Sequence, residues 1–322
     1  IEISLTTVNI DTRDWQWTTT FTFAHNKNKV KELMNGQDKL LSKDVTGNLF
    51  VGQPVNNVYG LAWDGIVSDQ NMTVPDLPIA AEHGFKAGET VRACDYYYAC
   101  YGWTEGQPIV RDVDGDGDFD NDDRIIYNSE PDWTGSFTSN LNYRLPKNGG
   151  DIDFSFSLYA KQGYTVNSPF MNSDYFDYHD RGRGKMAVDY YIPAGTLVDA
   201  GGMRADGTFI EPVYQTETHY GSYPFPNAGP SDGVGTQIGY WNEGKQFVDA
   251  SFVKVKNITL GYSFSKNLLK HIACQNLRVY FTVTNPIVWT KYRGFDPEWA
   301  TSSTKNDGPS VISYQIGANI KF

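Results

Sequence analysis

The sequence contains no run of about 18 apolar residues, the length that a membrane-spanning helix requires. It also lacks an excess of positive charge, because 27 Lys and Arg stand against 38 Asp and Glu, for a net charge of −11. Nucleic acids and anionic lipid headgroups attract clustered Lys and Arg. The composition therefore argues against a nucleic-acid partner and gives no electrostatic help to binding anionic lipid. Helical periodicity is nearly absent, and residues 266–272 are the best candidate for a helix.

Cysteines and catalytic motifs are also scarce. Three cysteines are too few for a disulfide scaffold. Cys94 and Cys100 are close enough in sequence to form a disulfide within one loop, and three free thiols are the alternative. The five histidines are scattered, without a His-Glu-x-x-His zinc motif, and the sequence has no Gly-x-Ser-x-Gly elbow and no phosphate-binding loop. We therefore expect no enzyme activity.

Aromatic residues and two-residue alternation are abundant. Aromatics make up 15% of the residues, which argues against disorder. Apolar and polar residues alternate over stretches of about 10 to 14 residues, longer than the usual globular strand of about 5 to 6 residues. The first and fifth stretches fit the alternation less cleanly. The expected strands, about seven, cover residues 1–8, 14–26, 133–145, 151–163, 249–264, 276–290 and 310–322.

Two further features favour a membrane barrel over a large soluble β-sandwich. Aromatic side chains such as Trp133, Tyr143 and Trp289 lie near the strand ends, where a barrel carries its aromatic girdles. Short turns alternate with long segments, about 27–132 and 164–248, as expected for periplasmic turns and extracellular loops. The predicted fold is all-β, the carboxyl-terminal part of a large antiparallel transmembrane β-barrel with long extracellular loops.

The number of strands indicates whether the chain can form a complete barrel. Bacterial single-chain barrels have an even number of strands, because an unpaired strand edge cannot lie in lipid. Seven strands therefore predict that residues 1–322 form part of a barrel. Because the sequence does not begin with a signal-peptide pattern, we expect Ile1 to be a mature terminus or a cut inside a larger protein. A missed strand within residues 50–67 would raise the number to eight.

Residues 112–123, DVDGDGDFDNDD, have the spacing of a twelve-residue calcium loop. Gly117 falls at position 6, where the loop turns sharply, and Phe119 is the apolar anchor at position 8. So many carboxylates at close spacing would repel one another without a cation. We expect a structural Ca²⁺ that fixes a long loop at the barrel mouth; the alternative is a solvated acidic turn. The predicted ligands are Asp112, Asp114, Asp116, Asp118, Asp120 and Asp123, with Asp118 offering its backbone carbonyl.

Five stretches, together about a third of the chain, resemble the SusC/RagA family of TonB-linked outer-membrane transporters of Bacteroidetes, and the chain closes on an alternating strand ending in Phe322. Residues 284–286, Thr-Asn-Pro, depart from the family's usual Gln-Asn-Leu-like segment. The stretches are VNIDTRDWQWTTTF (8–21), VGQPVNNVYGLAWDGI (51–66), the aspartate loop with DDRIIYNSEPDWTGSF (122–137), FVKVKNITLGYSF (252–264) and LRVYFTVTNPIVWTKYRGFDPE (277–298).

The resemblance implies a barrel of about 22 strands in the outer membrane, with an amino-terminal plug and a TonB box that this sequence does not contain. It also implies import of oligosaccharides, or in some cases peptides, driven by TonB, with a SusD-like surface lipoprotein as a lid. A calcium-stabilised secreted β-protein that binds glycans without spanning a membrane is the alternative function.

Two segments that we expect in the outer loops are dense in Tyr, Trp and Asp. Their most prominent residues are Tyr97 and Trp103 in one segment and Asp177 and Tyr178 in the other. Flat aromatic faces suit sugar rings and carboxylates accept hydrogen bonds from hydroxyls, but Tyr and Trp also favour protein interfaces. Contact with substrate, contact with a lid partner and packing within the loops are three open possibilities.

Overall fold

We analysed a computed structural model, which describes residues 1–43, 46–167, 189–225, 247–270, 274–292, 296–300 and 310–322. The chain forms two compact units. The first comprises Ile1–Val58, Tyr127–Ser168 and Val248–Phe322, and the second comprises Tyr59–Ile126 and Pro169–Phe247. No helix in the described ranges is both long enough and apolar enough to cross a membrane.

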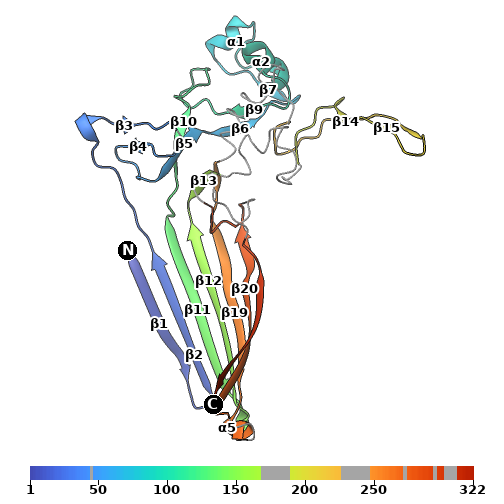
Figure 1. Ribbon diagram of the computed structural model, residues 1–322. Coiled ribbons are helices and arrows are strands. Elements are labelled where there is room, and N and C mark those ends of the chain that lie inside the picture. Colours follow the sequence, from blue (N-terminus) through green and yellow to red (C-terminus); the bar gives the residue numbers. More distant parts are fainter. Residues whose placement is uncertain (44–45, 168–188, 226–246, 271–273, 293–295, 301–309) are drawn as a thin grey trace. The chain divides into compact units, whose positions relative to one another are not determined.

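The first unit is built on a sheet of seven long antiparallel strands, each paired with its neighbours in chain order (Figure 1). The seven strands match the seven stretches of alternating residues. Within the described residues the sheet is open, since β1 and β21 each have one neighbour. The strands are β1 (Glu2–Asp11), β2 (Trp15–Ala24), β11 (Trp133–Arg144), β12 (Asp151–Gln162), β19 (Phe252–Ser263), β20 (Asn276–Thr290) and β21 (Ser313–Lys321).

The strand register separates apolar from polar side chains across the whole sheet. Because paired residues point to the same face, each row of partners tests the alternation. One row is apolar on all seven strands: Ile10, Trp17, Leu141, Phe154, Leu260, Phe281 and Ile316. A row on the opposite face is polar on all seven: Thr6, Thr20, Thr138, Ser157, Asn257, Thr284 and Ser313.

β-Bulges explain why the first and fifth stretches fit the alternation poorly. In β1 the register shifts between Val8 and Ile10, and in β19 it shifts between Val255 and Asn257. A bulge inserts an extra residue and changes which face the following residues occupy. The bulge also lets β1 run to Asp11, three residues past the end expected from the sequence.

Aromatic side chains border the apolar face near both strand ends. Trp15 stacks on Tyr143 at one end, with ring centroids 4.1 Å apart, and Phe23 stacks on Trp133 at the other, at 6.0 Å. Tyr143 and Trp133 are ten residues apart on β11, which corresponds to about 34 Å of strand. At the tilt of about 40° usual in membrane barrels this becomes about 26 Å, close to the height of about 25 Å of their apolar band.

The connections between the seven strands alternate in length, as the sequence predicted. β1 and β2 are joined through residues 12–14, β11 and β12 through the short η2 (Pro146–Asn148), and β19 and β20 through a segment that contains α5 (Lys266–Leu269). In an antiparallel sheet these three turns lie at the same end of the strands, and the long segments leave from the opposite end. Figure 1 shows α5 at the end of the strands where the short turns lie.

Near the short turns, glycines make room for an ion pair on the polar face. Arg278 donates two hydrogen bonds to Asp153, of 2.9 and 2.5 Å, across the intervening strand β19. A Cβ on Gly261 would lie 2.4 Å from Asp153 Oδ1 and 2.6 Å from Arg278 Nη2, so a larger residue here would displace the ion pair. A Cβ on Gly317 would similarly lie 2.3 Å from the Tyr280 ring.

The second unit contains short elements, among them two helices that the sequence pattern did not predict, α1 (Pro78–Glu82) and α2 (Ala93–Tyr101). Cys94 and Cys100 both lie on α2, and both thiols are free, as is that of Cys274. Six residues of helix separate two residues by about 9 Å along the axis, beyond the reach of a disulfide. The structure therefore favours free thiols.

Short strand pairs complete the fold. Two pairs lie where the sequence passes from one unit to the other: β5 (Asn57–Leu61) with β10 (Arg124–Asn128), and β13 (Thr165–Asn167) with β18 (Phe247–Asp249). β5 falls in the segment where an eighth strand was possible, but it does not join the seven-stranded sheet. The other pairs are β3 (Lys39–Leu40) with β4 (Leu49–Phe50), which η1 (Met34–Gly36) precedes, β6 (Trp63–Ile66) with β9 (Pro108–Val110), β7 (Asn71–Thr73) with β8 (Thr90–Arg92), β14 (Leu197–Asp199) with β17 (Val213–Tyr214), and β15 (Gly202–Met203) with β16 (Phe209–Ile210).

Candidate functional site

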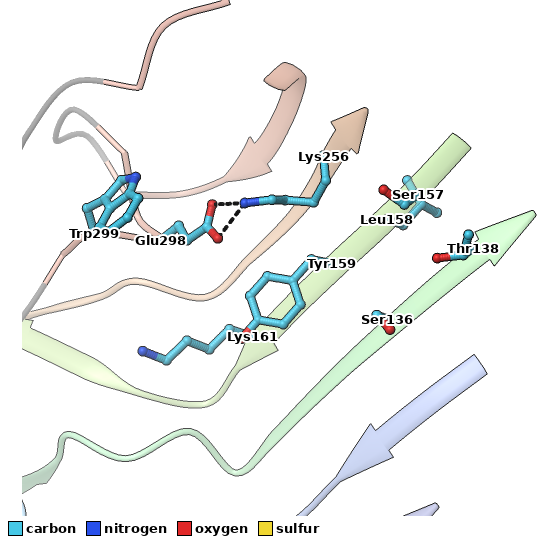
Figure 2. Close-up of a pocket in the computed structure, with 9 residues that line it drawn as sticks. All are labelled: Ser136, Thr138, Ser157, Leu158, Tyr159, Lys161, Lys256, Glu298 and Trp299. Atoms are coloured by element: carbon cyan, nitrogen blue, oxygen red, sulfur yellow. Dashed lines mark hydrogen bonds and ion pairs between the residues drawn. The ribbon is translucent and has the colours of Figure 1, made fainter. Parts of the chain in front are cut away.

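A buried cluster of charges lies on the polar face of the sheet, toward the end of the strands from which the long segments leave. Lys254, in β19, is 2% exposed, and its ammonium group donates hydrogen bonds to Asp296 (2.5 Å), Glu298 (2.9 Å) and Ser310 (3.2 Å). An ammonium group has three donors, so all of them are used. Lys256 binds both carboxylate oxygens of Glu298, at 2.6 and 2.8 Å (Figure 2).

A tight turn after β20 carries the two acids of this cluster. The Asp296 carboxylate accepts a hydrogen bond from the Glu298 N–H (3.0 Å), and the Asp296 carbonyl accepts from the N–H groups of Trp299 and Ala300. The Tyr164 hydroxyl donates to the Pro297 carbonyl at 2.7 Å. Apolar packing holds the same turn in place, in a cluster formed by Tyr164, Val166, Ala250, Tyr292 and Ala300.

Both acids of the turn are held in their ionised form. Burial alone would raise the pKa of Asp296, but hydrogen bonds from Lys254 and the Glu298 N–H outweigh it, so the pKa of this carboxyl is lowered. Burial would likewise raise the pKa of Glu298, and the bonds from Lys256 and Lys254 lower it. Two ammonium groups therefore face two carboxylates, and the cluster is neutral overall.

Beside this cluster lies a pocket of about 550 Å³. Tyr159 and Lys161 project from β12, and Trp299 and Glu298 come from the turn (Figure 2). The indole of Trp299 is 60% exposed, which leaves an apolar surface open to a ligand. The remaining lining residues are Ser136, Thr138, Ser157, Leu158 and Lys256.

The pocket combines a flat aromatic surface with hydroxyls and charged groups. Aromatic faces bind sugar rings and planar peptide groups, and hydroxyls donate or accept hydrogen bonds. This combination of groups is suited to binding a ligand that has both an apolar face and polar groups. The sequence patterns did not predict the pocket. Its signal was two lysines spaced by two, Lys254 and Lys256, in an otherwise apolar stretch, with Asp296 and Glu298 at the same spacing further on.

The predicted calcium loop folds as a compact turn in the second unit. Carboxylate oxygens of Asp112, Asp114 and Asp116 all lie within 4.8 Å of one another. Two oxygens that share one Ca²⁺ at about 2.3 to 2.6 Å can be at most about 5.2 Å apart, so these three fit a common ion. The two oxygens of Asp112 also accept hydrogen bonds from the N–H groups of Gly115 (2.6 Å) and Gly117 (2.9 Å), which closes the loop.

The other predicted ligands lie differently. Asp123 is buried, and its two oxygens accept hydrogen bonds from the N–H groups of Val113 (2.6 Å) and Asp120 (2.9 Å), so it clamps the ends of the loop together. Asp118 and Asp120 accept hydrogen bonds from nearby N–H groups. The structure thus brings three of the five predicted carboxylate ligands together.

Negative charges are crowded in this loop. The hydrogen bond from the Asp116 N–H lowers the pKa of Asp114, but burial and the charges of Asp116, Asp123 and Asp112 outweigh it and raise this pKa above its usual value. A cation would remove that repulsion.

The predicted aromatic site residues Tyr97 and Trp103 pack inside the second unit. Their rings stack with centroids 5.5 Å apart and an interplanar angle of 6°, and Trp103 is 8% exposed. Burial raises the pKa of Tyr97 to about 12. Phe119 of the calcium loop packs against Trp103 and Tyr101, at 4.8 and 5.1 Å, so the loop is anchored on this cluster.

This packing corresponds to the third of the possibilities that the sequence left open. Substrate or partner contact by Tyr97 and Trp103 stays a prediction. The other two candidates, Asp177 and Tyr178, lie outside the described residues.

Comparisons with known proteins find similarity to TonB-dependent receptors. No family model matches it. It is 26% identical over 329 residues to the TonB-dependent receptor SusC of Bacteroides thetaiotaomicron, covering 100% of this chain and 26% of that receptor. It is 27% identical over 347 residues to the TonB-dependent receptor P39 of Formosa agariphila, covering 100% of this chain and 30% of that protein.

Solved structures agree on the fold. The RagAB peptide transporter matches with a TM-score of 0.60 at 17% identity, over 100% of this chain and 29% of the other. The RagAB peptide importer in its open-open state matches with a TM-score of 0.57 at 19% identity, over 100% and 28%. The chain spans 26 to 30% of the length of these relatives. It matches the carboxyl-terminal part of a TonB-dependent receptor of the SusC/RagA type.

Proposed function

We propose that the complete receptor, to which this chain contributes the carboxyl-terminal part, is an outer-membrane importer of oligosaccharides or peptides. One observation carries the proposal: the seven-stranded sheet has a row that is apolar on every strand and, on its other face, a row that is polar on every strand. Such a sheet is a wall between hydrocarbon and a water-filled interior. The strands missing from its open edges come from the rest of the receptor, because unpaired edges are not tolerated in lipid.

The proposed energy source and partner are drawn by analogy from the relatives. SusC is a TonB-dependent receptor and RagAB is a peptide importer. By analogy, uptake here is driven by TonB, the amino-terminal barrel strands and the plug complete the receptor, and a SusD-like surface lipoprotein covers its mouth. Both substrate classes suit the pocket, since a sugar ring and a peptide group can each lie on Trp299.

A secreted glycan-binding protein is less favoured. Such a protein would expose the apolar row to water, and Leu260, the fifth of the seven residues in that row, is 52% exposed. An exposed apolar patch spanning seven strands is typical of a membrane or partner surface.

Calcium is a second element of the proposal. The loop of residues 112–123 binds one structural Ca²⁺ through Asp112, Asp114 and Asp116, with Asp118, Asp120 and Asp123 as the further predicted ligands. Three observations support it: the mutual proximity of three carboxylates, the raised pKa of Asp114, and the anchoring of Phe119 in the aromatic cluster. The ion would stiffen the loop and take no part in chemistry.

Uptake by whole cells tests the import function. Cells that carry the complete receptor accumulate labelled oligosaccharides or peptides, and deletion of the receptor or of TonB abolishes the accumulation. The native complex, isolated from outer membranes with mild detergent, contains a surface lipoprotein. Uptake that persists without TonB, or a receptor recovered in the aqueous fraction without detergent, would contradict the proposal.

A further inference from the structure

Positive charge is left over in the pocket beside Trp299. Lys254 and Lys256 are neutralised by Asp296 and Glu298 through the contacts described above. Lys161 has no carboxylate within 4 Å among the described residues. Its ammonium lies over the ring of Tyr164, 3.9 Å from the centroid. A ring face attracts a cation but leaves its charge uncompensated.

The position of this charge matters for function. Lys161 is the penultimate residue of β12, at the end of the strands from which the long segments leave. It lies on the same face of the sheet as Tyr159. In the proposed orientation this is the outer mouth of the barrel interior, where an incoming substrate passes. In a chain with a net charge of −11, a pocket whose Lys161 ammonium forms no ion pair with any described carboxylate stands out electrostatically.

The neighbouring groups define a ligand with two features. An ammonium group pairs with a carboxylate, and hydroxyls among the other lining residues can donate further hydrogen bonds to a ligand. The exposed Trp299 indole offers an apolar face to a ring or a planar amide. A pocket of about 550 Å³ is within the usual range for small ligands, so it holds one or two units of a chain rather than a whole oligomer.

We infer that the pocket formed by Lys161, Tyr159 and Trp299 binds a carboxylate-bearing unit of the transported ligand, with the carboxylate on Lys161 and the adjoining ring or amide on Trp299. The inference rests on the proposed import function. Two sources supply this chemistry: a uronic acid unit of an oligosaccharide, or the carboxylate of a peptide.

Binding to the purified complete receptor in detergent tests the inference without requiring transport. The probes are tri-galacturonic acid against neutral maltotriose, and a short peptide with a free carboxyl terminus against its amidated form. We expect one acidic probe to bind at least about tenfold more tightly than its neutral counterpart, which is about 1.4 kcal/mol. The pair that shows the preference identifies the source of the carboxylate.

Variants then assign the preference to Lys161. Lys161→Gln abolishes it, Lys161→Arg retains it, and Trp299→Ala weakens both members of the preferred pair. Lys321→Gln is the matched control, since it removes the same charge from the same face of the sheet, but on β21 near the short turns. Heat-modified migration on gels checks that each variant barrel has folded.

Three outcomes would overturn the inference. They are equal binding of acidic and neutral probes to the unchanged receptor, equal effects of Lys161→Gln and Lys321→Gln, and unaltered ligand binding by Lys161→Gln with loss of receptor stability, which would assign Lys161 to contact with the plug. TonB-dependent uptake of neutral substrates would survive in all three cases. Failure of the inference is therefore distinguishable from failure of the import function.

Discussion

Replacement of Lys254 by methionine tests whether the buried ion pair holds the turn at residues 296–300. Methionine keeps most of the side-chain volume but leaves Asp296, 3% exposed, without its cation. Removing one partner of a buried pair costs about 3 to 5 kcal/mol. If the turn opens as one unit, amide exchange of Trp299 and Ala300, which donate to the Asp296 carbonyl, accelerates roughly 150- to 5000-fold.

Hydrogen exchange read out by mass spectrometry on the complete receptor measures this change. Lys256→Met is the control, because that side chain is 35% exposed and its loss leaves Glu298 bound to Lys254. An exposed pair contributes up to about 1 kcal/mol, so exchange accelerates by at most about fivefold. Equal acceleration in the two variants, or none in Lys254→Met, would refute the argument.

The same ion pair gives the turn a pH dependence. The pKa of Asp296 is lowered in the folded protein, so its carboxylate binds protons more weakly there than in the unfolded chain. The pair therefore stabilises the turn fully above the unfolded-state value of about 3.9, and this stabilisation is lost as pH falls through the lower, folded-state pKa. Exchange at Trp299 accelerates below pH 4 in the unmodified receptor and loses this dependence in Lys254→Met.

Three further predictions concern the strand face, the calcium loop and the aromatic cluster. Gly261→Ala forces a Cβ against Asp153 and Arg278, so it lowers the unfolding free energy of the receptor by about 1 to 3 kcal/mol in urea titrations, whereas Gly65→Ala, with nothing within 4 Å, does not. Chelation releases about one Ca²⁺ per receptor, measured by elemental analysis, and increases cleavage by proteases near residues 112–123. Asp112→Asn has the same effect as chelation, whereas the control Asp122→Asn does not. Absence of bound metal at millimolar free calcium excludes the site. Trp103→Ala destabilises the second unit by about 3 to 5 kcal/mol, while Tyr98→Ala, at a 64% exposed position, has little effect; reduced uptake by a stable Tyr97→Ala variant would instead indicate substrate or partner contact.

The long strands were predictable because their signal is local. Two-residue alternation depends only on which face each side chain occupies, so stretches such as 276–290 specify their strand without knowledge of their partners. Pro286, which cannot donate to a strand ladder, lies where β20 pairs irregularly with the bulged part of β19. The bulges at Val8 and Val255 were visible only as imperfect alternation, because their positions depend on the neighbouring strand.

The pocket was not predictable because it depends on contacts between distant residues. Lys254 and Asp296 are 42 residues apart, and their contact requires the chain after β20 to turn back over the polar face. Helix α2, ACDYYYACY, has no apolar periodicity that would reveal it. The calcium loop, in contrast, was predictable in part, since ligand spacing is local; the clamping role of Asp123 was not.

Accessibility of adjacent positions on β19 tests the central claim most directly. Spin labels attached to single cysteines at positions 260 and 259 of the complete receptor, in a background without its native cysteines, report collisions with oxygen, which concentrates in lipid, and with a water-soluble nickel complex. We predict that the label replacing Leu260 meets oxygen and that the label replacing Thr259 meets the nickel complex. Equal accessibility at both positions, or exclusion of both reagents from position 260, would contradict a sheet with one face in lipid and the other in water.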